Sequence, residues 1–144
     1  MIMTLPKKVS ALAYFSARLN GWLSDGSERL LWLSSWETEP PQPLLFFEEI
    51  RKGSGDSRHI IDAPGHLLET PNSTEAALLT GLIFLVIGFG WEAYIVPQEL
   101  ADFVYLGDEH VVCSSARPEK MRELSEMVAA FGLRTINDIR EAWD

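Results

Sequence analysis

The chain has 144 residues, of which 47% are hydrophobic and 23% charged, and this balance excludes a disordered, charge-rich chain. Its length is near the usual size of one domain, so we expect a single globular domain over residues 1–144. Twelve basic residues against 21 acidic ones give a net charge of −9, which argues against a nucleic-acid partner, because phosphate binding depends on neutralising cations.

The negative charge is concentrated in the second half of the chain. Residues 1–72 carry seven basic and nine acidic side chains, whereas residues 73–144 carry five and twelve. The stretch 92–109 has five acidic residues and no Lys or Arg, so a charged partner that docks there should be basic. A solvated face that only aids solubility is the alternative. The candidate surface residues are Glu92, Glu99, Asp102, Asp108 and Glu109.

Cysteine usage favours a cytoplasmic protein, because the lone Cys113 cannot form an internal disulfide. The apolar stretch 9–17 follows Lys7 and Lys8 and has the length of a signal-peptide hydrophobic region. Two serines and a tyrosine interrupt this stretch and Arg18 ends it, so an amphipathic helix explains it better.

Residues 76–91 form the other membrane candidate, because they contain no charged side chain. A helix of this length would span about 24 Å, which is short of the roughly 30 Å hydrocarbon core of a bilayer. We therefore predict a central helix buried on most sides and no membrane association.

The first half of the chain predicts two helices and one strand. Apolar spacing indicates a helix over 6–20 that ends at Asn20-Gly21. Residues 29–36 are apolar on both faces at their start, as in an interior strand, and Trp32 and Trp36 should share one face. A short helix is expected over 44–52, after the proline-rich loop.

The middle of the chain predicts a short strand at 57–62, a tight turn at 63–66 and then the apolar helix. Asn72 followed by Glu75 resembles a capping box, and Gly88 or Gly90 would end the helix. A stripe of small residues on this helix would allow another element to approach closely: Ala77, Gly81 and Gly88.

The second half predicts an antiparallel meander followed by helices. The three strands are expected at 91–96, 103–106 and 111–114. A helix should begin at Pro118 and end at Gly132, and a last short helix should run from 135 to 143.

These elements predict an α+β fold, an antiparallel sheet of four or more strands with helices packed mainly on one face. A three-layer α/β arrangement is the alternative, because strand 29–36 could pair parallel to a later strand across the helices.

The densest group of ionisable side chains lies in the segment HIIDAPGHLLE. All four residue types can ligate metals, yet Pro64-Gly65 would break a helix that aligned them, and their spacing fits no metal signature. A pocket role and a structural role are both open, and we expect no cofactor. The candidate pocket residues are His59, Asp62, His66 and Glu69.

Nucleophilic catalysis is not indicated. In a strand, His110 and Cys113 would point to opposite faces, so an activated thiolate is not expected. Ser114 and Ser115 lack the glycines of a nucleophile elbow and suit a strand-to-helix junction. The sequence contains five tryptophans, and an exposed pair among them would mark a ligand or partner surface.

The sequence therefore favours a small acidic cytoplasmic protein-binding module, comparable to an immunity protein that neutralises a basic toxin or to a regulatory partner. The alternatives are a metal-dependent hydrolase that uses His59, Asp62 and His66, and a small-ligand sensor with a pocket beside the apolar helix.

Overall fold

The computed structural model describes residues 1–23, 28–36, 42–53, 55–59, 62, 64–68, 73–97 and 101–137. These residues form four helices and seven strands. In chain order the elements are β1 (Ile2–Thr4), α1 (Val9–Leu23), β2 (Arg29–Ser35), α2 (Gln42–Gly53), β3 (Gly65–Leu68), α3 (Ser73–Gly88), β4 (Glu92–Pro97), β5 (Asp102–Leu106), β6 (His110–Ser115), α4 (Pro118–Phe131) and β7 (Thr135–Ile136).

The strands form one sheet in the order β3-β2-β4-β5-β6-β1-β7. Every neighbouring pair in this sheet is antiparallel. The predicted meander is confirmed as β4-β5-β6, and it lies at the centre of the sheet. The three-layer alternative is wrong, because β2 pairs antiparallel with both β3 and β4.

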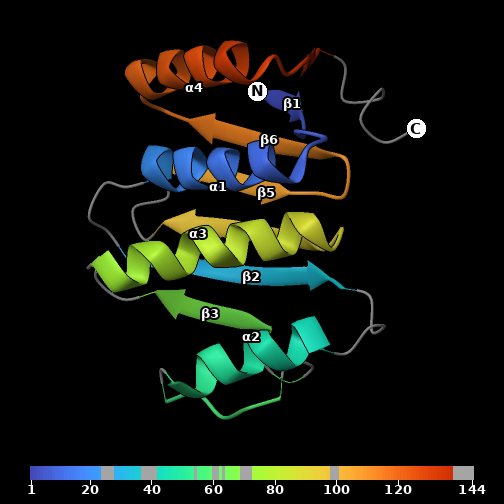
Figure 1. The fold of residues 1–144 in the computed structure, drawn as a ribbon. Coiled ribbons are helices and arrows are strands. Elements are labelled where there is room, and N and C mark those ends of the chain that lie inside the picture. Colours follow the sequence, from blue (N-terminus) through green and yellow to red (C-terminus); the bar gives the residue numbers. More distant parts are fainter. Residues whose placement is uncertain are drawn as a thin grey trace.

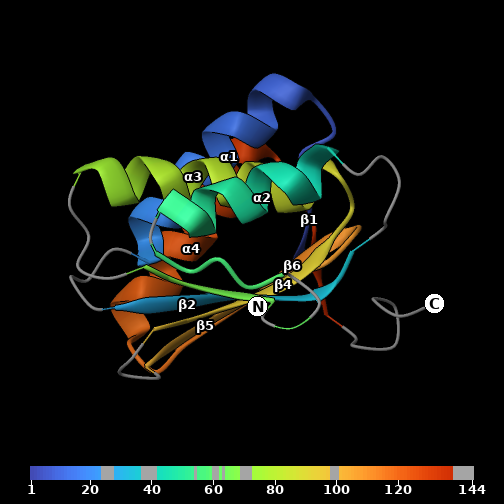
Figure 2. The same cartoon turned by 90° about the horizontal axis from the view of Figure 1, so that it is seen from below.

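All four helices lie on one face of the sheet, in the order α4, α1, α3 and α2 across the strands (Figure 1). Seen from below, the helices form one layer and the strands a second, and no described element lies on the other face of the sheet (Figure 2). The predicted α+β architecture is confirmed.

The hydrophobic core lies between the two layers, because strand residues alternate between them. Leu31 and Leu33 of β2 are buried towards the helices, while Trp32 between them is exposed on the other face. The β2–β4 register shifts between Leu33 and Ser35, which breaks the alternation. Trp36 therefore packs against the core, and the expected shared face of Trp32 and Trp36 is wrong.

α1 continues past the predicted stop at Asn20-Gly21. The amide of Asn20 donates to Thr80 Oγ1 of α3 at 2.8 Å. Two residues further, the Trp22 indole donates to the Lys120 carbonyl oxygen at 2.8 Å, and Leu23 is fully buried. These tertiary contacts outweigh the low helix propensity of Asn-Gly.

The predicted strand at 57–62 is wrong, because its described residues, 57–59 and 62, form no strand and are not paired in the sheet. The Asp56 carboxylate accepts from the backbone N–H and the guanidinium of Arg58, and such local bonds compete with strand pairing. The predicted turn at 63–66 is also corrected, since Gly65 and His66 begin β3. β3 pairs with β2, and Trp32 lies opposite Gly65.

The two ends of the chain add short strands that the pattern did not reveal. β1 lies between β6 and β7, with Met3 opposite Val111 and Thr135. Thr135 and Ile136 are therefore strand residues rather than the start of a helix. Asn137 is not helical either, and residues 138–143 of that predicted helix, like the Asn72 cap, lie outside the described residues.

α3 is the most apolar helix and is buried along much of its length, with Leu82, Ile83 and Val86 completely inaccessible. No helix among the described residues is long and apolar enough to cross a bilayer. The stripe of small residues does not serve as a contact, because Gly81 and Gly88 are exposed and a Cβ on either would meet no atom within 4 Å.

Gly81 should therefore be replaceable with a gain in stability. We expect Gly81→Ala to raise the free energy of unfolding by about 0.5–1 kcal/mol, because alanine loses less backbone entropy in a helix. Gly132 ends α4 with φ +62° and is the matched contrast, since Gly132→Ala should lower stability. Urea unfolding of both variants measures the difference, and equal shifts would contradict the expectation.

Candidate binding surface

The acidic stretch 92–109 is not one continuous surface. Glu92 begins β4 and is half-buried, whereas Asp108 and Glu109 are exposed in the turn between β5 and β6. Asp102 is 2% exposed, and Glu99 lies outside the described residues. Asp102 is therefore not a surface residue, although its place in the stretch suggested one.

Asp102 belongs to an internal charge cluster. Its Oδ2 accepts hydrogen bonds from Lys120 Nζ at 2.6 Å and from the Arg117 guanidinium, and its Oδ1 accepts one from Ser115 Oγ at 2.6 Å. The Lys120 ammonium also lies 5.2 Å from the ring centre of Trp22 in α1. The cluster thus connects β5, β6, α4 and α1.

The electrostatics of this cluster favour the ionised carboxylate. Burial would raise the pKa of Asp102, but hydrogen bonds from Lys120, Ser115 and Arg117 oppose it and hold the pKa below its ordinary value of 3.8. The negative charge of Asp102 is compensated inside the protein, so its role is structural.

The face of the sheet opposite the helices carries a row of large side chains. Residues directly opposite one another in antiparallel strands project from the same face. The strand registers give one row across all seven strands, in which Gly65 is the only member without a side chain. The row runs Gly65, Trp32, Tyr94, Tyr105, Val112, Ile2 and Ile136.

Aromatic side chains of β4, β5 and β6 contact one another on this face. The ring centres of Tyr94 and Tyr105 are 5.0 Å apart, and Phe103 lies 5.8 Å from Tyr94. The ring of His110 lies beside that of Tyr105, with ring centres 5.9 Å apart. Trp32 is 44% exposed and Tyr94 37%, although both lie at the middle of strands rather than in loops. We call Trp32, Tyr94, Phe103 and Tyr105 the aromatic face.

The position of Trp32 depends on Gly65 in the neighbouring strand. A Cβ on Gly65 would lie 3.1 Å from both the Trp32 ring and Leu30 Cδ1. The indole therefore covers the glycine backbone, an arrangement known to stabilise glycines in sheet edges. Trp32 therefore packs against the neighbouring edge strand β3 on one side of its ring.

The charge of the aromatic face is negative. Glu92 shares this side of β4 with Tyr94. The pKa of Tyr105 is raised to about 12, first by burial and then by the charge and the hydrogen bond of Glu92. The strand residues that the structure describes put no Lys or Arg on this face. The Arg29 side chain is on the helix side, 3% exposed.

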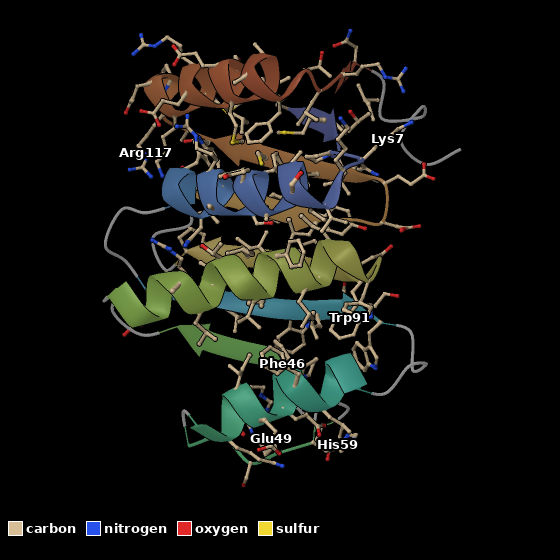
Figure 3. The ribbon with its side chains drawn as sticks, viewed as in Figure 1. Lys7, Phe46, Glu49, His59, Trp91 and Arg117 are labelled. Carbon is tan, nitrogen blue, oxygen red and sulfur yellow. The ribbon has the colours of Figure 1, made fainter. Side chains whose placement is uncertain are left out.

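Of the predicted pocket group, the structure describes the side chains of His59 and Asp62. His59 is exposed and lies beside α2 (Figure 3). Its Nε2 is 3.3 Å from Oε1 of Glu48. Asp62 is exposed. The neighbouring carboxylate of Asp56 forms ion pairs with Arg51 and Arg58. No group of three or more potential metal ligands occurs among the described residues. The His66 side chain and Glu69 lie outside them.

Cys113 is fully buried on the helix side of β6, while His110 is on the opposite side beside Tyr105. The expected separation of the two side chains is confirmed. Burial raises the pKa of the Cys113 thiol to about 12. The structure thus supports the role of Cys113 as a small core residue.

The thiol of Cys113 should therefore be unreactive in the folded protein. At pH 8 we expect a disulfide reagent such as DTNB to modify Cys113 at least about 100-fold more slowly than in urea-unfolded chains, because only the thiolate reacts and the site is closed. Release of thionitrobenzoate measures both rates. Comparable rates would show that the β6 region opens readily.

Comparisons with known proteins give no further identification: no family model, curated protein or solved structure matches the chain.

Proposed function

We propose that this chain is a binding module that recognises a basic protein through its aromatic face. The observation that carries the proposal is a sheet face left open by the helices, with Trp32 and Tyr94 exposed at mid-strand beside one carboxylate. Exposed aromatic clusters of this kind are typical of interaction sites rather than of ordinary protein surface.

The chemistry of the face favours cationic side chains. Trp and Tyr rings attract Arg and Lys by cation–π interactions, and they supply large rigid contact areas that dominate interface energies. Glu92 provides a carboxylate next to Tyr94 and Tyr105. The net charge of −9 would accelerate the approach of a basic partner.

The class of protein that suits these features is an immunity protein bound to a basic toxin, or a regulatory subunit bound to a basic target. Asp108 and Glu109, exposed at the β5–β6 turn, would extend the negative surface beyond Glu92. A cytoplasmic location suits the single buried thiol of Cys113.

The proposal can be tested by capture from a lysate of the native source with matched baits. The wild-type protein, a Trp32→Ala/Tyr94→Ala variant and a Tyr14→Ala variant would be immobilised in parallel. Tyr14 is the control because it is 72% exposed on α1, away from the sheet. We expect a basic protein to be retained by the wild type and by Tyr14→Ala and lost from the double variant.

Two results would contradict the proposal. One is the same stoichiometric protein on all three baits, which would place the interface elsewhere on the chain. The other is an acidic partner whose retention does not weaken with added salt, because binding to a negative surface must be screened by ions.

A further inference from the structure

A cavity of about 410 Å³ opens at one end of the helix layer. It lies between the segment that leads into α1, the end of α3 and the β5–β6 turn. Figure 3 shows Lys7 and Trp91 at this end, opposite Arg117. Its volume falls within the range of small-molecule sites.

The walls of the cavity are mostly apolar. Leu12 and Ile87 are buried at the base, whereas Phe89 is 47% and Val9 71% exposed at the rim. Phe89 also contacts Trp91, with ring centres 5.9 Å apart. Water in this cavity would face hydrocarbon on most sides, so an apolar ligand would gain free energy by displacing it.

The polar groups of the cavity are Lys7, Lys8 and Asp108. Both lysines are exposed, and neither forms an ion pair with any residue that the structure describes. Asp108 packs against Gly90, where its Oδ1 would lie 2.8 Å from an added Cβ. The mouth therefore has a net positive charge in a protein whose total charge is −9.

From this combination we propose that the cavity binds a single-chain anionic amphiphile, a fatty carboxylate. The alkyl chain lies between α1 and α3 against Leu12, Phe84 and Ile87. The carboxylate remains at the mouth beside Lys7 and Lys8. This site is separate from the aromatic face and does not depend on the proposed protein partner.

Decanoate, kept below its micelle-forming concentration, is a suitable probe, and calorimetric titration measures its binding. Gly88 lines the cavity and has free space around its Cα, so Gly88→Phe should block the site and weaken decanoate binding at least about tenfold. Gly81→Phe is the matched control, since Gly81 is also exposed on α3 with free space around it but does not line the cavity. It should bind decanoate normally.

The charge requirement is tested separately. Lys7→Gln/Lys8→Gln should weaken decanoate binding about five- to tenfold, whereas Lys52→Gln/Arg122→Gln, which removes the same charge from α2 and α4, should not. Decylamine, whose ammonium group is repelled by the lysines, should bind more weakly than decanoate.

Any one of three results would overturn the proposal: no heat of decanoate binding to the wild-type protein, equal binding by the Gly88→Phe and Gly81→Phe variants, or equal affinity for decanoate and decylamine.

Discussion

Asp102→Asn is expected to lower the free energy of unfolding by about 3–5 kcal/mol, because it leaves Lys120 without its counter-charge inside the protein. The Lys120 side chain is 10% exposed and that of Asp102 is inaccessible, so water cannot replace the lost carboxylate. Arg117 and Ser115 bond to different oxygens of Asp102, and asparagine keeps only one of them, so one of these two donors also loses its acceptor. Chemical denaturation with urea measures the loss.

Glu109→Gln is the matched control, because it removes one negative charge from an exposed residue in the turn before β6. Its effect should stay within about 0.5 kcal/mol. Adding Lys120→Met to Asp102→Asn should restore part of the stability, since the second change removes the uncompensated ammonium. A loss below about 1 kcal/mol for Asp102→Asn would show that the cluster is already hydrated.

The same cluster gives the protein a predictable acid sensitivity. The pKa of Asp102 is lower in the folded chain than its ordinary value of 3.8, so the carboxylate stabilises the fold above that value. This contribution disappears as the pH falls through the lower, folded pKa. The stability difference between wild type and Asp102→Asn should therefore be constant at neutral pH and shrink in acid.

The strength of local patterns decided which parts of the fold the sequence could predict. The meander 92–115 has β-rich segments separated by Pro97 and Gly107, and α4 has Pro118 at its start and Gly132 at its end. These signals are local, and the structure confirms both. β1 and β7 are short strands without such local signals. β1 forms by pairing with β6, and β7 forms by pairing with β1.

The candidate site was harder to predict, because its residues are far apart in the sequence and become neighbours only when the strands pair. Asp102 appeared to be one member of an acidic run, and its partner Lys120 lies 18 residues further on. The aromatic face draws on three strands, β2, β4 and β5. The alternation of Trp32 with Leu31 and Leu33 was visible in the sequence, but the open face could be recognised only when all helices were placed on the other side.

Once a partner protein has been isolated, substitutions in the aromatic face should lower its affinity much more than they lower the stability of the fold. Trp32→Ala is expected to weaken binding about 30- to 1000-fold, the loss typical of a central aromatic anchor. Tyr94→Ala should have a smaller effect in the same direction, because its ring is partly covered by Phe103 and Tyr105. Calorimetry or surface plasmon resonance measures both.

Stability should change much less than affinity. Trp32 is 44% exposed and its ring lies over Gly65, so we expect its truncation to lower the free energy of unfolding by less than about 1.5 kcal/mol. Glu92→Gln separates the electrostatic part, because it keeps the shape of the face and removes its carboxylate. Glu92→Gln should make association less dependent on salt. It should leave the affinity at high salt nearly unchanged. If Trp32→Ala unfolded the protein while Glu92→Gln left the salt dependence unchanged, the face would be a structural layer rather than a binding site.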